Sequence, residues 1–203
     1  ETRDKFAVSS GEAVMNLLEK NIRPRDIVTR KSLENAAVIV AASGGSTNAA
    51  LHLPAIANEA GIRFTLQDVT NISKKTPYIA DLKPGGKYVA KDLYEIGGVP
   101  ILIKALLDGG YLHEDCMTVS GKTISENHKD VIFPSNQKVI YKTSKPLSSS
   151  GGFVGLKGNL APDGAIVKIA GMKRKKFKGK AKCFDNEPSA LNAVLEKKIK
   201  PGD

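Results

Sequence analysis

The stretch NAAVIVAASGGSTNAALHL, residues 35–53, carries the strongest local signal for the fold. Its first part, from Asn35 to Ala42, is almost entirely small or apolar, which predicts the buried end of a helix. Residues 43–48 then combine two glycines with short polar side chains, a composition typical of a turn. A second helical pattern follows and ends at Gly61, a common stop residue. The stretch therefore predicts two helices joined by a polar, glycine-containing loop.

Helical periodicity dominates the sequence up to about Lys129, and short runs of strand-forming residues follow Gly152. Ser9 or Ser10 is the expected cap of the first helix, and Pro24 suits the first turn of the second. We expect helices over residues 9–20, 24–40, 49–61, 67–75, 88–96, 99–107, 118–128 and 189–198, and strands over residues 153–157, 165–170 and 180–184.

A change of composition predicts a domain boundary near Ser150. Residues 145–152 have the Pro, Ser and Gly content of a linker. We therefore expect a mostly helical domain over residues 1–148 and the opening of a β-rich domain over residues 149–203. Because the sequence starts at Glu1 without a Met and ends in a turn signal, we expect a fragment of a longer protein.

The charge is positive and uneven. The 203 residues carry 31 Lys and Arg against 21 Asp and Glu, and residues 173–182 place seven basic side chains around Phe177. This run leaves a small nucleic-acid-binding module open, but without a series of aromatics we favour a solvated loop and edge strand. Asp26 and Arg30 have the spacing of a solvated helical pair. No apolar run approaches the roughly 20 residues of a membrane span, so we expect no membrane partner.

The histidines and cysteines do not form a recognisable metal motif. Cys116 and Cys183 lie far apart without a CxxC pair, which argues against a zinc site or a disulfide framework. Cys116 could be a reactive thiol, but we favour a buried, inert cysteine. His52 could act as an acid or base one helical turn beyond the polar loop, although a core histidine is the commoner case. His113 and His128 are expected at the surface.

The polar loop is the candidate binding element. Gly44 and Gly45 allow backbone N–H groups to converge on an anion at the positive end of the next helix. Ser46, Thr47 and Asn48 add neutral hydrogen-bonding side chains at the same point. The loop matches neither the Walker A nor the GxGxxG pattern. It fits a site for a carboxylate or phosphate, and an ordinary helix-to-helix turn is the alternative.

Several ordered segments resemble those of the dihydroxy-acid dehydratase and phosphogluconate dehydratase family along nearly the whole chain. They are PRDIVTRKSLEN (24–35), GGSTNA (44–49), LHL (51–53), ADLKPGGKY (80–88), DL (92–93), GGVP (97–100), TVSGKT (118–123), GNLAPDG (158–164) and VK (167–168). The ADLKP and GGVP segments are closer to the dihydroxy-acid branch than to the sugar-acid branch.

The resemblance implies an activity and a set of cofactors. The expected reaction is dehydration of 2,3-dihydroxy-3-methyl carboxylic acids to 2-oxo acids in valine and isoleucine synthesis, and a sugar-acid (aldonate or phosphogluconate) dehydratase is the alternative. The family uses an iron–sulfur cluster, Mg²⁺ and a serine base. The matching ligands and serine lie outside these 203 residues, and neither Cys116 nor Cys183 fits the ligand motifs. We therefore expect no catalytic residue and no metal ligand in this chain, and no activity from it alone.

The resemblance also implies a fold and an environment. The fold class is α/β: the mostly helical second half of an α/β N-terminal domain, then the start of a β-barrel-like swivelling domain. Residues 44–48 carry over as a substrate-binding loop. The expected partners are a small dihydroxy acid and further copies of the full-length enzyme, in a homodimer or higher oligomer, but no nucleic acid. The expected location is the cytoplasm, or a plastid or mitochondrion in a eukaryote.

Overall fold

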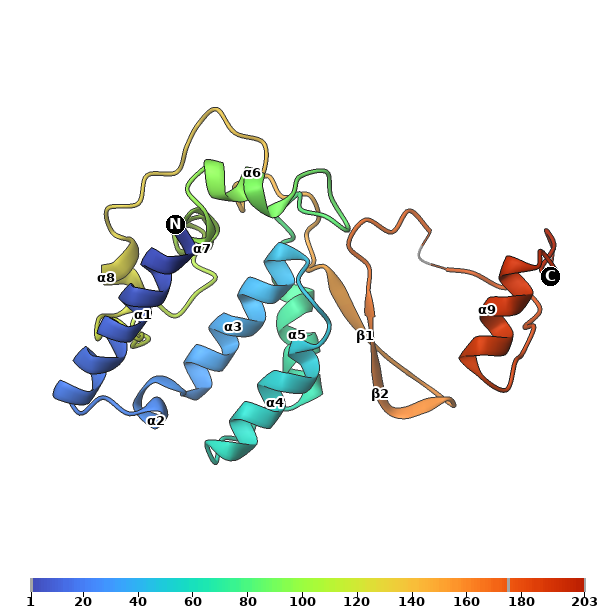
Figure 1. The fold of residues 1–203 in the computed structure, drawn as a ribbon, viewed down its shortest axis with the longest axis horizontal. Coiled ribbons are helices and arrows are strands. Elements are labelled where there is room, and N and C mark those ends of the chain that lie inside the picture. The colour runs from blue at the N-terminus through green and yellow to red at the C-terminus, as the bar shows by residue number, and fades with distance from the viewer. Residues whose placement is uncertain (1, 175, 203) are drawn as a thin grey trace. The chain divides into compact units, whose positions relative to one another are not determined.

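The structure, a computed structural model, describes residues 2–174 and 176–202 and is mixed α/β (Figure 1). It divides into two compact units, one ending at Gly171 and the other starting at Met172. Among the described residues, no helix has both the length and the apolar character of a membrane span. In chain order the elements are α1 (Thr2–Glu19), α2 (Pro24–Ile27), α3 (Arg30–Ser43), α4 (Ala49–Glu59), α5 (Leu66–Lys75), α6 (Ala90–Glu95), α7 (Val99–Asp108), α8 (Ile124–His128), β1 (Phe153–Gly158), β2 (Ala161–Lys168) and α9 (Glu187–Leu195).

Helix α3 is central to the first unit because its two faces pack into two different cores. One core contains Val38 and Ala42 of α3 together with side chains of α7. The other contains Leu33, Ala37 and Ala41 together with side chains of α4, α5 and β1. Small side chains let neighbouring elements approach the helix closely. Ala37, Ala41 and Ala42 are fully buried, which confirms the prediction of a helix buried at its C-terminal end.

The C-terminal end of α3 binds the backbone of several other segments. The Ala41 carbonyl accepts hydrogen bonds from the N–H groups of Gly44 (3.4 Å) and Gly152 (2.9 Å). The Ala42 carbonyl accepts one from Ile79 (2.9 Å). The last carbonyls of a helix have no partner within the helix, so neighbouring segments can satisfy them. This helix end therefore connects the loop after it, the segment around residue 79 and the start of the hairpin.

The helix predicted over residues 24–40 is two helices in the structure. Val28 and Thr29 have extended backbones between α2 and α3. The Thr29 hydroxyl accepts from the Ser32 N–H at 3.2 Å, and the Ser32 hydroxyl oxygen accepts from the Thr29 N–H at 2.8 Å. This reciprocal capping starts a new helix at Arg30.

The predicted pair between Asp26 and Arg30 is wrong because the break places them on different helices. Asp26 instead accepts from the Arg23 N–H at 2.8 Å. Arg30 donates to Glu34 and to Asp68, both at 2.8 Å, and so links α3 to α5. The Arg30 guanidinium is the main cause that lowers the pKa of Asp68 from 3.8 to about 2.

The other predicted helices are partly confirmed. α4, α5, α6 and α7 match their predicted ranges with small shifts at the ends. α1 starts at Thr2, and the Ser10 hydroxyl donates to the Phe6 carbonyl within the helix (2.8 Å) instead of capping it. α8 starts at Ile124 because Thr123 and Glu126 form a reciprocal cap. The prediction of a helix from residue 118 is therefore too long.

α1 leaves large apolar side chains exposed: Phe6, Val8, Val14, Met15 and Leu18.

The hairpin β1–β2 is antiparallel, with Phe153 opposite Lys168 and Leu156 opposite Ala165. It confirms the strand predicted at residues 153–157, and it confirms the strand predicted at residues 165–170 in part, because β2 starts at Ala161 and ends at Lys168. The residues before it are fixed to the helices, because the Gly151 N–H donates to the Ser73 carbonyl at 2.8 Å. The domain boundary near residue 150 stays a prediction.

The second unit contains α9 and an exposed segment before it. The strand predicted at residues 180–184 is wrong: the segment has no regular structure and its side chains are exposed. It buries no face, and strand preference depends largely on such burial. α9 starts at Glu187, two residues before the predicted start, because the Asn186 side chain accepts from the Ser189 N–H at 2.9 Å. Lys175, within the basic run, lies outside the described residues.

The ion pair between Arg30 and Asp68 predicts an acid-sensitive contribution to stability. A lowered pKa stabilises the fold above the ordinary pKa of the carboxyl, and this stabilisation is lost as the pH falls toward 2. We expect Asp68→Asn to lower the free energy of unfolding by about 1–2 kcal/mol at pH 7, with the difference disappearing near pH 2. Urea unfolding at several pH values measures this. Asp108→Asn, in an exposed pair with Lys104, should change stability by less than about 0.5 kcal/mol. The prediction is contradicted if the free energy of unfolding has the same pH dependence in the wild type and in Asp68→Asn.

Candidate functional site

The loop of residues 44–48 joins α3 to α4, and its glycines end α3 (Figure 1). Gly44 has φ +61°, and its N–H donates to the Ala41 carbonyl. The Gly45 N–H donates to the Val40 carbonyl at 2.9 Å. These two bonds form the usual left-handed helix stop, in which glycine avoids the steric cost of a side chain. Both glycine amides therefore already donate to carbonyls of α3 in this structure, and the expectation that residues 44–48 bind an anion stays a prediction.

The donors that remain come from the next residues of the loop. Within the described part of the chain, the backbone N–H groups of Ser46 and Thr47 have no hydrogen-bond partner. Ser46 and Asn48 are exposed, and the Asn48 N–H donates to the Ser46 hydroxyl at 3.2 Å. Asn48 is the first flanking residue of α4 and makes no side-chain cap. Two unpaired amides and two polar side chains thus lie at the positive end of α4, an arrangement that suits an anionic oxygen.

The inner side of the loop packs against Tyr78. A Cβ atom at Gly44 would lie 2.8 Å from Cε2 of Tyr78 and 3.2 Å from Cβ of Ala170. A Cβ atom at Gly152 would lie 2.7 Å from Cα of Gly44. Glycine is therefore required at residue 44 both by its backbone conformation and by its neighbours.

This contact predicts different costs for alanine at two left-handed glycines. Gly44→Ala should lower the free energy of unfolding by about 2–3 kcal/mol, because a strained φ is combined with overlap on the Tyr78 ring. Gly61→Ala is the matched control: its φ is +72° but nothing lies within 4 Å, so about 1 kcal/mol is expected. Urea unfolding measures both values. Equal losses would show that the ring contact does not restrict residue 44.

The three histidines have different surroundings. His52 is exposed, which corrects the expectation of a core histidine. His113 Nε2 contacts a Glu34 carboxylate oxygen at 2.6 Å and remains partly exposed. His128 Nδ1 contacts the Ile124 carbonyl at 2.7 Å, within α8. The imidazole rings of His113 and His128 therefore each have a partner within the fold.

The described residues do not offer a set of ligands that fits an iron–sulfur cluster or a metal ion. Among residues 2–174 and 176–202, no group of three or more His, Cys, Asp or Glu side chains could hold a metal. Cys116 is buried, and burial is the main cause that raises the pKa of its thiol. A raised pKa disfavours the thiolate, which is the form that binds metals and reacts. Cys183 is exposed and belongs to the second unit.

These environments predict a large difference in thiol reactivity. In the native protein, a disulfide reagent should modify Cys183 rapidly and Cys116 at least about tenfold more slowly, because Cys116 is buried and its thiolate is disfavoured. Peptide mapping by mass spectrometry distinguishes the two sites. Urea should abolish the difference. Comparable rates in the native state would contradict the burial of Cys116.

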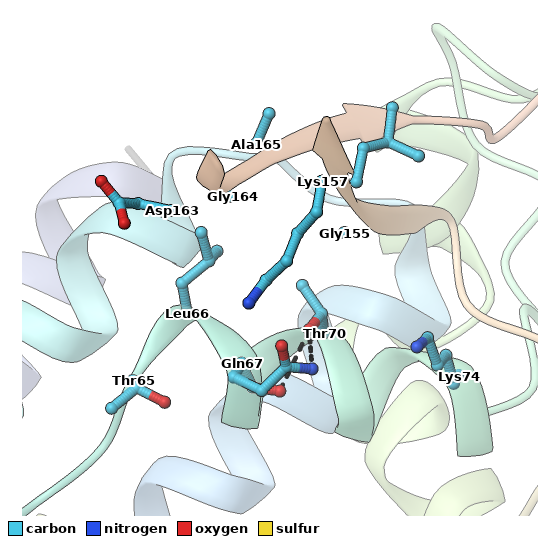
Figure 2. A pocket seen from close by; sticks show the side chains of 11 residues that line it. Thr65, Leu66, Gln67, Thr70, Lys74, Gly155, Lys157, Asp163, Gly164 and Ala165 are labelled. Carbon is cyan, nitrogen blue, oxygen red and sulfur yellow. Dashed lines mark hydrogen bonds between the residues drawn. The ribbon is translucent and has the colours of Figure 1, made fainter. Parts of the chain in front are cut away.

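A separate pocket of about 400 Å³ lies between α5 and the hairpin (Figure 2). Figure 2 shows the Lys157 side chain extending from the hairpin toward Gln67 and Thr70 of α5, whose side chains are hydrogen-bonded to each other at 3.2 Å. Lys74 and Asp163 also line this pocket, whereas residues 44–48 do not. Sequence reasoning did not find it, because its two walls are about 90 residues apart in the chain. The local signal for this pocket is limited to two charged residues, Lys157 and Asp163, which lie on either side of the hairpin turn.

Two family models match the chain. Residues 1–127 match the family described as dihydroxy-acid/6-phosphogluconate dehydratase N-terminal. Residues 138–203 match the family described as dihydroxy-acid/6-phosphogluconate dehydratase C-terminal. The two matches leave residues 128–137 between them, and the segment of changed composition, residues 145–152, lies within the second match.

The chain is also similar to curated bacterial proteins over its whole length. It is 68% identical over 203 residues to the dihydroxy-acid dehydratase of Pelagibacter ubique, covering 100% of this chain and 36% of that protein. It is 62% identical to dihydroxy-acid dehydratase 2 of Bradyrhizobium diazoefficiens, covering 100% of this chain and 35% of that protein. It is 50% identical over 202 residues to the dihydroxy-acid dehydratase of Acidothermus cellulolyticus, covering 99% and 36%. The chain thus spans about a third of the length of these relatives.

Proposed function

Because the chain belongs to the dihydroxy-acid/6-phosphogluconate dehydratase family, we propose that it is part of a dihydroxy-acid dehydratase. The observation that carries this proposal is 68% identity over all 203 residues to a protein of that name. The proposed reaction removes a proton from C2 and the hydroxyl group from C3 of a 2,3-dihydroxy-3-methyl carboxylic acid. The resulting enol tautomerises to the 2-oxo acid, with one water released. A sugar-acid dehydratase is the alternative within the same family.

The proposed role of this chain is to bind the substrate. The substrate carboxylate would accept hydrogen bonds from the Ser46 and Thr47 amides and from the side chains of Ser46 and Asn48, at the positive end of α4. The glycines shape the loop and end α3. The iron–sulfur cluster and Mg²⁺ that the family resemblance implies do not fit the residues that the structure describes. We propose that these cofactors and the serine base are held by other parts of the full-length protein, meaning a polypeptide of the relatives' length that contains this chain.

We further propose a cytoplasmic homo-oligomer without a nucleic-acid partner. The relatives named above are bacterial, and the same reaction in a eukaryote would be placed in a plastid or mitochondrion. The exposed basic segment contains one aromatic ring, Phe177, and the Arg174 guanidinium lies 4.8 Å from its centre. That contact occupies one ring face that a base would otherwise stack on.

The full-length protein tests the proposed reaction directly. After reconstitution with iron, sulfide and Mg²⁺, it should form 2-oxo acids from dihydroxy-methyl acids much faster than from aldonates. Preference for aldonates would instead favour the sugar-acid alternative. Turnover by the isolated 203 residues would contradict the proposal that the cofactor ligands lie elsewhere.

A substitution in the loop tests the binding role. Ser46→Ala should raise KM for the dihydroxy acid about tenfold and change kcat little, because one hydrogen bond to an anion is lost in both the ground and transition states. Asn58→Ala, an exposed position near the other end of α4, is the control and should leave both constants unchanged. An unchanged KM for Ser46→Ala would remove this loop from the substrate site.

A further inference from the structure

Tyr78 is a buried residue whose hydroxyl group lacks a partner. Its side chain is 7% exposed, and within the described residues its hydroxyl oxygen is buried without any hydrogen bond. A buried hydroxyl that has lost water and gained no partner is unfavourable, whereas phenylalanine would fill the same space without that penalty. Packing therefore explains the ring but not the hydroxyl group.

The hydroxyl end of the ring lies against the candidate loop. A Cβ atom at Gly44 would lie 2.8 Å from Cε2 and 3.3 Å from Cζ of Tyr78, and Cζ is the atom that carries the hydroxyl. The backbone of Tyr78 is fixed on both sides: its N–H donates to the Ser148 carbonyl, and its carbonyl accepts from the Leu147 N–H, both at 2.9 Å. These two backbone hydrogen bonds therefore hold the residue in place, and the hydroxyl end of its ring lies near Gly44 of the loop.

The hydroxyl remains a hydrogen-bond donor. Burial, together with the negative charge of Asp81, raises the pKa of Tyr78, so the phenol keeps its proton near neutral pH. The amides of Ser46 and Thr47 are also donors without partners in the described part of the chain. The Ser46 and Thr47 amides, which belong to the loop, and the Tyr78 hydroxyl, whose ring packs against Gly44, are thus three hydrogen-bond donors that an oxygen-rich acceptor would satisfy.

We infer that Tyr78 is a positioning residue of the substrate site, whose hydroxyl donates a hydrogen bond to an oxygen atom of the bound dihydroxy acid. The inference rests on the proposed function and extends it to a residue outside the loop. The hydroxyl is buried and the ring packs beside Gly44, so under this inference binding includes a small displacement that brings the hydroxyl into reach of the substrate. The left-handed glycine, which has no side chain between loop and ring, permits this approach.

Tyr78→Phe in the full-length, reconstituted enzyme tests the inference. The expected result is a KM for the dihydroxy acid raised about tenfold, with kcat within about threefold of the wild type. The melting temperature without substrate should be unchanged or higher, because an unpaired buried hydroxyl is removed. The stabilisation by saturating 2-oxo acid product should also decrease. Tyr94→Phe, at an exposed position of α6, is the control and should match the wild type in all these measurements.

Two other results would overturn the inference. A lower melting temperature with unchanged KM would assign the hydroxyl a purely structural partner. If KM, kcat and the stabilisation by 2-oxo acid all equal those of the wild type, the hydroxyl does not reach the substrate. A wild-type enzyme without activity on dihydroxy acids would refute the proposed function, and the inference with it. Normal wild-type activity beside an unaltered variant refutes the inference alone.

Discussion

The carbonyl groups at the end of α3 determine how the first unit is assembled. A helix leaves its last carbonyls unpaired, and burying them without partners is costly. Here the Val40 and Ala41 carbonyls bind the two loop glycines, Ala41 also binds Gly152, and Ala42 binds Ile79. The two cores meet at this helix, so the same few backbone groups fix the loop, the segment that contains Tyr78 and the start of the hairpin relative to one another.

This arrangement changes which atoms of the loop can bind a ligand. Paired glycines at a helix junction are often interpreted as amide donors, but helix termination uses those of Gly44 and Gly45 here. The remaining donors are one step further along the chain, at Ser46 and Thr47. They lie at the start of α4, where the helix dipole favours negative charge. In the proposed function, the carboxylate of the dihydroxy acid would occupy that location.

Local signals in the sequence predicted much of the fold. Gly61 marked the end of α4, and the range predicted over residues 67–75 agrees with α5, because both patterns depend on neighbouring residues. Ordered family segments such as residues 44–49 indicated the family. The break at Thr29 was missed because its reciprocal cap uses serine, where the common capping box has Glu or Gln. The strand at residues 180–184 was predicted from a local pattern without knowledge of a pairing edge.

The candidate site was less predictable because it depends on contacts between distant residues. The bond between Arg30 and Asp68 joins residues 38 positions apart, and nothing in the sequence selects it over the spacing of Asp26 and Arg30. Likewise, the unpaired hydroxyl of Tyr78 is visible only when the atoms around it are known. The pattern of residues 44–48 located the loop, but it could not show that α3 already occupies both glycine amides.

The close approach of Gly152 to Gly44 has a mechanical consequence. There is no room for even one methyl group between the two backbones. The Gly152 carbonyl also accepts hydrogen bonds from the N–H groups of Ile169 and Ala170, which directly follow β2 in the chain. Any rotation of the hairpin about its base would therefore be transmitted to the loop without an intervening side chain to absorb it. Rotation of the hairpin and displacement of the loop that carries the Ser46 and Thr47 amides would then be a single coupled movement.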